Sequence, residues 1–332
     1  MPRNVVLHTV GGPDVLTIEQ SATVEPGPGE VRIAVRAIGL NRAEAMFRSG
    51  TYLEYPQFPA RLGYEASGVI DAVGPGVVGL NEGDAVSVVP SFSFSDYGLY
   101  GESVLAPARA VVLNPPSLSF EEAAALWMAF ATAWCGLVDI AHVRRDDTVL
   151  LPAASSSVGL AAIQVVRGLG AIPIAITRTR AKAAQLEEAG AAHVIVTNEQ
   201  RIDIEVARIT NGKGARIAFD PVGGPDFPLL VAATREQGVI VVYGALSDEV
   251  TPLPMLDVLG RQLTIQGFAL SNVMDDDAKL AEVKRFVFDG AAQGLFTPVI
   301  AEVFEFEDIR HAHAVMEQNR HFGKLIVRVG HG

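Results

Sequence analysis

A run of apolar and small residues from Val149 to Ala162 constrains the fold of this chain more than any other segment. It predicts a buried strand over Val149–Pro152, a turn of small residues, and an apolar helix over Val158–Leu169. A strand that passes through a small-residue turn into a helix N-terminus can hold a pyrophosphate on free backbone N–H groups. The segment therefore predicts a dinucleotide-binding unit.

The turn departs from the glycine-rich pattern that is usual at such sites. Ser156 and Ser157 stand where glycines are common, and Gly159 remains to allow close packing of the helix against the strand. Serine is small enough to admit a phosphate, and its hydroxyl can donate a hydrogen bond to it. An ordinary strand-to-helix turn with serine N-caps has the same composition, so the turn alone is a weak signal.

The next strand strengthens the cofactor interpretation. It is predicted over Ile172–Ile176, and it ends in a basic segment that contains Arg178 and Arg180. NAD-binding folds place an acid here, on the ribose 2′-hydroxyl, whereas cations suit the additional phosphate of NADP. We therefore expect NADPH as the cofactor and hydride transfer as the chemistry.

Composition narrows the class of protein. The chain has 332 residues, of which 49% are hydrophobic, and this predicts two domains or one elaborate domain. A net charge of −12 argues against nucleic acid or an anionic membrane as the main partner. Cys135 is the single cysteine, which excludes a disulfide framework and a thiolate zinc cluster. The N-terminus lacks a signal-peptide core, and no run of 18 apolar residues occurs, so we expect a cytoplasmic protein.

The pattern of predicted secondary structure changes near residue 120. The preceding part alternates short apolar runs with turns, which predicts an all-β unit, a twisted barrel. The following part opens with an apolar helix over Glu121–Ala141 and then alternates strands and helices, which predicts a parallel sheet covered on both faces. The tail, Pro298–Val329, is predicted as strand, helix and strand, and we expect it to return to the first domain.

Several short motifs recur in an order and spacing that resemble one known superfamily. They are Gly39–Glu44, Arg48–Gly50, Leu62–Ile70, Val73–Val77, Gly83–Val86, Ser155–Gly159, Asp220–Gly224 and Gly323–Val327. Together they resemble the medium-chain dehydrogenase/reductase superfamily, in particular its zinc-free, quinone-oxidoreductase-like branch. The resemblance implies an α/β fold with two domains. A GroES-like β-barrel catalytic domain would comprise residues 1–122, completed by 268–332, and a Rossmann domain with a doubly wound parallel sheet would bind NADPH with residues 123–267.

Zinc is not expected in this chain. Zinc-dependent relatives carry cysteine at the position of Asn41 and histidine at that of Tyr64. An amide and a phenol bind zinc poorly compared with thiolate and imidazole. His311 and His313 are two residues apart in a predicted helix, so they cannot face one ion together.

Without zinc, conjugate reduction is the easier chemistry for such a site. Hydride passes to the β-carbon of an enone or to a quinone, and hydrogen bonds stabilise the developing oxygen anion. A metal-free carbonyl reductase or alcohol dehydrogenase, and a non-enzymatic NADPH-binding relative, remain alternatives. The aromatic, serine-rich segment Pro90–Tyr100 indicates only an apolar or aromatic guest.

The resemblance also assigns roles to single residues. Asn41 is expected near the nicotinamide and the substrate, where its amide could donate to the substrate oxygen or to the cofactor ribose. Tyr64 and Tyr52 are the available phenols for proton donation, with plain packing as the alternative. Met46 stands where some relatives have a further tyrosine.

The expected cofactor contacts come from both domains. They are Asn41, Met128, Thr132, Ser155, Ser156, Ser157, Val158, Gly159, Thr177, Arg178, Lys182, Asn198, Gly244, Ala245, Phe268, Ala269 and Lys324. Within this set, Arg178 and Lys182 would hold the 2′-phosphate. The alternative for Lys324 is a solvated charge before a strand. We further expect a homodimer, because Leu263–Gly267 would otherwise leave an apolar sheet edge uncovered.

Overall fold

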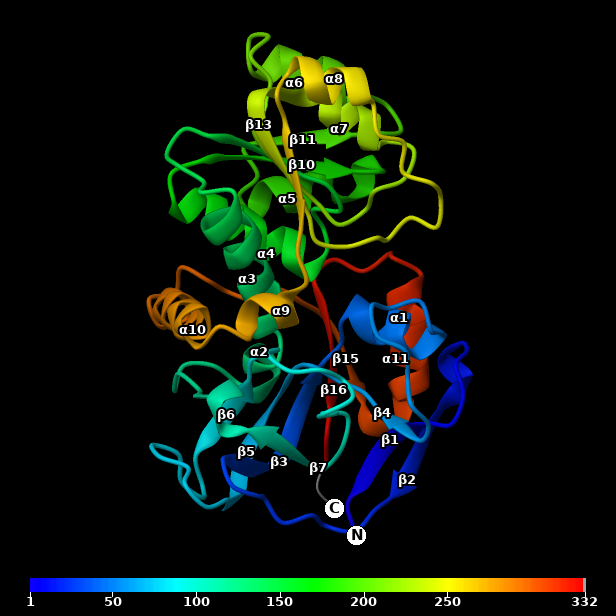
Figure 1. Cartoon of the computed structure of the whole chain (residues 1–332), viewed down its shortest axis with the longest axis vertical. Coiled ribbons are helices and arrows are strands. Elements are labelled where there is room, and N and C mark those ends of the chain that lie inside the picture. The colour runs from blue at the N-terminus through cyan, green and yellow to red at the C-terminus, as the bar shows by residue number, and fades with distance from the viewer. Residues whose placement is uncertain (331–332) are drawn as a thin grey trace. The chain divides into compact units, whose positions relative to one another are not determined.

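The computed structural model describes residues 1–330 and divides the chain into two compact units (Figure 1). The first unit comprises Met1–Met128 and Met274–Gly332, and the second comprises Ala129–Val273. Each unit is built around sheets of its own.

The first unit contains a seven-stranded sheet and a three-stranded sheet. The larger sheet has the order β15-β16-β3-β5-β6-β8, with β7 also paired to β3, and the smaller has the order β2-β1-β4. The strands are β1 (Arg3–Leu7), β2 (Leu16–Gln20), β3 (Glu30–Gly39), β4 (Ala60–Arg61), β5 (Ala66–Val73), β6 (Ala85–Val88), β7 (Ser103–Pro107), β8 (Val111–Leu113), β15 (Ile300–Glu305) and β16 (Lys324–Arg328). Because β16 pairs antiparallel with β3, the C-terminal tail forms part of this unit.

The prediction that the first 120 residues are all-β is wrong at one point. An eight-residue helix, α1 (Arg42–Ser49), follows β3 directly. The carboxylate of Glu44 reaches back to the backbone N–H of Asn41 at 2.6 Å, and Gly50 ends the helix in the left-handed conformation at φ 75°. These are ordinary start and stop signals for a helix, but α1 is too short to show a clear helical period.

Further helices cover the sheets of the first unit or lie at its boundaries. They are α2 (Phe120–Ala123), α9 (Leu270–Met274), α10 (Asp277–Ala292) and α11 (Ile309–Glu317), with short 3₁₀ turns at Pro13–Val15, Ala108–Ala110 and Phe306–Asp308. Asp276 caps α10 by accepting from the N–H groups of Ala278 and Lys279.

The second unit is a parallel sheet with helices, coloured green to yellow in Figure 1. Its strand order is β11-β10-β9-β12-β13-β14, which is the order of dinucleotide-binding folds. The strands are β9 (Thr148–Leu151), β10 (Ile172–Thr177), β11 (His193–Val196), β12 (Ala215–Asp220), β13 (Thr234–Val242) and β14 (Thr264–Gly267). The helices are α3 (Trp127–Ala133), α4 (Ser157–Gly168), α5 (Ala183–Glu188), α6 (Ile202–Ile209), α7 (Phe227–Ala233) and α8 (Met255–Gly260), with a π-helical stretch over Trp134–Ile140 and a 3₁₀ turn over Arg180–Lys182. The predicted fold class is confirmed.

One helical stretch, Phe120–Ile140, is long and apolar enough to cross a membrane by length and composition. It is the only such stretch in residues 1–330, and 83% of its apolar window is buried inside the protein. At Gly136 a Cβ atom would lie 2.2 Å from the ring of Phe219, so the helix packs closely on the sheet. These are the properties of a core helix.

Candidate cofactor and catalytic site

The turn after β9 is shaped for close approach. Ala153 has a positive φ of 48°, and Ser156 caps α4 by accepting from the N–H of Gly159 at 3.1 Å. A Cβ atom at Gly159 would lie 2.6 Å from the Cα of Ala154, so only glycine fits there. The serine N-cap does not prevent this turn from binding a phosphate, because the first turn of α4 still carries N–H groups with no partner inside the helix.

One cation of the second unit, Lys182, contacts this turn, and a second, Arg178, lies near Lys182. Lys182 Nζ donates to Ser155 Oγ at 3.0 Å. Burial lowers the pKa of Lys182, and the nearby charge of Arg178 lowers it further. Arg178 is exposed, and no ion pair joins it to any residue between 1 and 330. Arg180, by contrast, is paired with Glu199.

The other expected contacts of the second unit follow the carboxyl ends of its strands. Asn198 follows β11, and its N–H donates to the carbonyl of Arg178 at 3.2 Å. Gly244 and Ala245 follow β13, Phe268 and Ala269 follow β14, and Thr177 is the last residue of β10. Parallel strands present their carboxyl ends at one edge of a sheet, which is where such folds bind nucleotides. Thr132 lies in α3 and is 6% exposed.

Asp220 and Asp84, which belong to two of the motifs that carry the resemblance, stabilise turns. The Asp220 carboxylate accepts from the N–H groups of Val222 at 2.9 Å and Gly223 at 3.0 Å, and Asp84 accepts from the N–H of Asn81 at 2.7 Å. They hold glycine-rich turns rather than ligands.

A buried polar network lies in the first unit, around Lys324. The ammonium group is 1% exposed and donates to Asn41 Oδ1 at 2.5 Å and to Glu65 Oε2 at 2.6 Å. The other oxygen of Glu65 accepts from the backbone N–H of Met128 at 3.0 Å. The interpretation of Lys324 as a solvated charge is therefore wrong, because Glu65 pairs with it inside the protein.

Asn41 is held from every side by this network. Its Nδ2 donates to the carbonyl of Gly39 and to Glu44 Oε1, both at 3.1 Å, while its Oδ1 accepts from Lys324. Both amide hydrogens are therefore engaged, and only one lone pair of Oδ1 is left. This geometry favours accepting a hydrogen bond over donating one to the substrate oxygen.

Glu44, like Glu65, belongs to the network although the sequence did not predict a site role for it. It is fully buried, and burial raises its pKa to about 7, against the opposing charge of Lys324. Its Oε1 also accepts from the backbone N–H of Tyr64 at 3.1 Å. The available signal was its place three residues after Asn41, at the start of a helix.

The two phenols lie against one aromatic side chain but differ in exposure. Tyr64 is 3% exposed and stacks on Phe94 with ring centroids 3.7 Å apart, and its hydroxyl donates to Glu54 Oε1 at 3.4 Å. Tyr52 is half-buried and meets Phe94 edge-on. Burial raises the pKa of both hydroxyls, and the hydrogen bond with Tyr64 partly offsets this rise for Tyr52. Tyr52 is thus the outer and more accessible phenol.

Side chains suited to a metal ion do not gather in the described part of the chain. It contains no group of three or more histidine, cysteine, aspartate or glutamate side chains that could hold one. His313 is fully buried, and burial lowers its pKa to about 3. His311, two residues earlier, is exposed and packs edge-on against Phe304. The described residues therefore offer no donor set that fits a catalytic zinc.

A chain that combines a dinucleotide-binding sheet with a second, β-sheet unit has the organisation of two-domain dehydrogenases. Comparison with known proteins identifies the family. Residues 27–116 match the alcohol dehydrogenase GroES-like domain, and residues 157–287 match a family described as zinc-binding dehydrogenase. The chain belongs to the medium-chain dehydrogenase/reductase superfamily, in its quinone-oxidoreductase-like branch.

Individual relatives cover nearly the whole chain. Quinone oxidoreductase of Salmonella typhimurium is 31% identical over 98% of this chain and 99% of its own length. Synaptic vesicle membrane protein VAT-1 homolog of Rattus norvegicus is 30% identical over 99% of this chain and 84% of its own length. A 2-haloacrylate reductase of Burkholderia sp. is 28% identical over 97% of both chains.

Solved structures agree on the fold and differ in the cofactor that they name. Escherichia coli quinone oxidoreductase complexed with NADPH has a TM-score of 0.90 at 27% identity, covering 98% of this chain and 99% of that one. A structure described as an NAD-dependent alcohol dehydrogenase has a TM-score of 0.89 at 34% identity, covering 99% and 100%.

Proposed function

We propose that this protein is an NADPH-dependent oxidoreductase that reduces quinones or α,β-unsaturated carbonyls without zinc. The observation that carries the cofactor assignment is the pair formed by Arg178 and Lys182 beside Ser155. Two cations at the end of the second strand suit a 2′-phosphate, where an NAD-dependent enzyme would place an acid. The quinone oxidoreductase relatives and the NADPH complex support the same assignment.

NADPH, when bound, supplies the hydride. The chain's own residues orient it and handle protons. Lys324 and Glu65 fix the Asn41 carbonyl, whose remaining lone pair can accept from a ribose hydroxyl. Of the two phenols, Tyr52 is the better placed to deliver a proton, with Tyr64 behind it. Met128 is held to the network through its N–H.

The reaction is tested by following NADPH absorbance against a panel of quinones, enones and aldehydes, with analysis of the products. A saturated ketone from an enone supports the proposal. An allylic alcohol would instead favour a metal-free carbonyl reductase or alcohol dehydrogenase. The similarity to the solved structure of an NAD-dependent alcohol dehydrogenase supports this alternative. Activity should survive exhaustive chelation, and stoichiometric zinc that is needed for turnover would overturn the zinc-free part.

A non-enzymatic role is the remaining alternative, because one relative carries the name of a vesicle membrane protein. It would retain NADPH binding and show no turnover with any member of the panel. We also propose a cytoplasmic location, which fractionation into soluble and membrane-bound protein tests directly.

We infer a homodimer from the edge of the second unit's sheet. Three of the four residues of β14 are exposed, and nearby α8 exposes Leu256 at 85% and Leu259 at 66%. An exposed strand edge beside exposed leucines is a surface that joins another copy of the chain. Light scattering at micromolar concentration tests this, and a monomer mass would refute it.

A further inference from the structure

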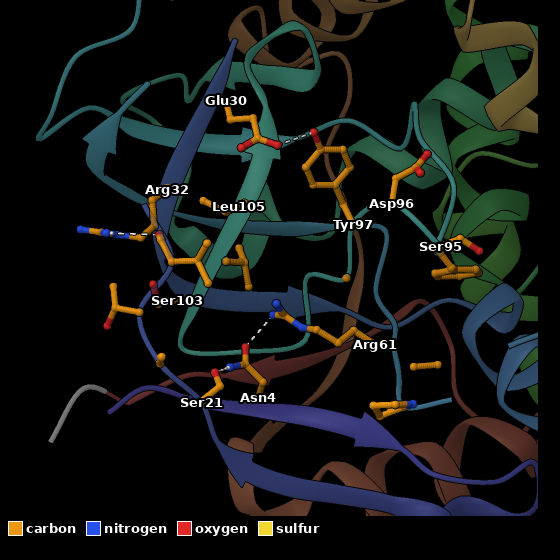
Figure 2. Close-up of a pocket in the computed structure, with 18 of the residues that line it drawn as sticks. Asn4, Ser21, Glu30, Arg32, Arg61, Ser95, Asp96, Tyr97, Ser103 and Leu105 are labelled. Carbon is orange, nitrogen blue, oxygen red and sulfur yellow. Dashed lines mark hydrogen bonds between the residues drawn. The ribbon is translucent and has the colours of Figure 1, made fainter. Parts of the chain in front are cut away.

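A pocket of about 360 Å³ lies within the first unit, and no role has been assigned to it (Figure 2). Its walls come from β1, β3, β4 and β7, from the segment 21–24 and from the loop 94–98. None of the expected cofactor contacts or the two candidate phenols lines it. The pocket shares the Phe94 ring with the two phenols but contains neither phenol, so its polar groups differ from those of the candidate catalytic site.

Arg61 is the charged group that distinguishes this pocket. Its Nη2 donates to Asn4 Oδ1 at 2.5 Å, and Asn4 in turn donates from Nδ2 to Ser21 Oγ at 2.5 Å (Figure 2). Asn4 is 2% exposed, so its amide is fixed by the fold. The guanidinium is thus oriented in advance by a buried side chain, as in sites built to receive a ligand.

No carboxylate neutralises this guanidinium. Across residues 1–330 Arg61 makes no ion pair, and its buried Nε has no hydrogen-bond partner. Burial lowers the pKa of Arg61, and no nearby acid counteracts this effect. Arg32, which lines the same pocket, is by contrast paired with Asp71 at 2.8 Å and Glu25 at 2.9 Å. A desolvated cation without a counter-charge is costly, and an anion would remove that cost.

The other side chains that line the pocket limit the charge and the shape of an anion that could bind there. Glu30 also lines it, but its carboxylate already accepts from the Tyr97 hydroxyl at 2.7 Å and from the N–H of Gly27 at 2.9 Å. Asp96 lines the pocket too, and neither acid forms an ion pair with Arg61 within residues 1–330. One unpaired guanidinium balances one negative charge, so a doubly charged guest would leave excess negative charge in a pocket that already contains two carboxylates. Phe94 and Leu105 supply apolar wall for an uncharged body.

We propose that this pocket binds a small monocarboxylate with an apolar body, whose carboxylate pairs with the Arg61 guanidinium. Guanidinium and carboxylate form short, charge-assisted hydrogen bonds. Asn4 occupies Nη2 of Arg61, and no hydrogen bond within residues 1–330 occupies Nη1, so its hydrogens can serve as donors. The proposal does not depend on the cofactor or on the reaction.

Benzoate is the probe, measured by calorimetry and by thermal unfolding on the full chain. Arg61→Met should raise the Kd for benzoate about 10- to 100-fold, because it removes a charge-assisted contact. Arg36→Met is the matched control, since it removes the same charge from an exposed position of β3 and should leave the Kd unchanged. Benzoate binding should also be unaffected by saturating NADPH.

Each other outcome counts against the proposal. Failure of benzoate to bind wild-type protein, or equal binding to Arg61→Met, shows that the pocket is not a carboxylate site. Inorganic phosphate that binds more tightly than benzoate shows that the ligand class is wrong. If Arg61→Met does not fold, the Nε–Hε resonance of Arg61 in wild-type protein gives the answer, because benzoate should shift it and leave that of Arg36 in place.

Discussion

Lys324 and Arg61 are two cations of the same unit that the fold treats in opposite ways. Lys324 is closed in by Asn41 and Glu65, with its charge neutralised inside the protein. Arg61 has an amide partner and lines a pocket, but it forms no ion pair within residues 1–330. A buried charge with permanent partners belongs to the architecture, whereas one with an opening and no counter-ion leaves space for a ligand.

Substitution of Lys324 should have the largest effect on stability, and it tests whether the two cations really differ in their role. Lys324→Met should lower the free energy of unfolding by about 3–5 kcal/mol, because Glu65 is left buried without its cation. Arg61→Met should lower it by no more than about 1 kcal/mol. Urea unfolding at pH 7 measures both. The double variant Lys324→Met/Glu65→Gln should recover part of the loss, and equal stability of Lys324→Met and wild type would show that the network is unimportant.

His313 is a third buried titratable group, and its ring nitrogens have no hydrogen-bond partner among residues 1–330. It avoids the cost of a buried charge by staying neutral. Its pKa is lowered from 6.5 to about 3 by burial, so between these values the unfolded chain binds a proton that the folded chain lacks. Stability should therefore fall by a few kcal/mol as pH falls from 6.5 toward 3. Unfolding measured across this range should show a smaller fall for His313→Met.

Glu44 should give the opposite slope. Burial raises its pKa from 4.5 to about 7, so the folded chain keeps a proton that the unfolded chain loses between these values. Its contribution to stability is complete below pH 4.5 and is lost as pH rises through about 7. Glu44→Gln should remove this slope in the same unfolding series, and a slope that persists in the variant would locate the titration elsewhere.

The two phenols, Tyr52 and Tyr64, should differ in their effect on turnover. Tyr52→Phe should lower turnover with an enone by about 10²-fold, within the range for general acids, and Tyr64→Phe should lower it less. The reason is exposure, since Tyr64 is buried beneath Phe94 and tethered to Glu54. Pre-steady-state hydride transfer in light and heavy water measures the effect. Unchanged rates and isotope effects in both variants would make water the proton donor.

How much of this could be predicted depends on the distance along the chain between the partners. The phosphate turn and the parallel sheet follow local patterns, and they were predicted. The hydrogen-bond network around Lys324 could not be predicted, because Lys324 lies 283 residues from Asn41 and 259 residues from Glu65 along the chain. Local context made Lys324 equally compatible with a solvated charge. The lack of an ion pair at Arg61 in the described residues is likewise a tertiary property that no local pattern contains.

The second unit also contains a paired and an unpaired cation, in two arginines that are two residues apart. Arg180 is paired with Glu199, whereas Arg178 has no ion pair in the described chain and lies beside Lys182. Arg178→Ala should raise the Kd for NADPH about 10- to 100-fold and leave the Kd for NADH almost unchanged, because only NADPH carries the 2′-phosphate.

Arg180→Ala is the matched control for that measurement. It removes the same charge from the same turn, but from a side chain whose charge Glu199 already neutralises, and it should alter neither Kd by more than a small factor. Fluorescence titration of the reduced cofactors into each variant gives both constants. Equal loss of NADPH and NADH in Arg178→Ala would mean that the arginine holds a part common to both cofactors. A wild type that prefers NADH would place this chain with NAD-dependent alcohol dehydrogenases instead, and would leave the unpaired charge of Arg178 without its proposed ligand.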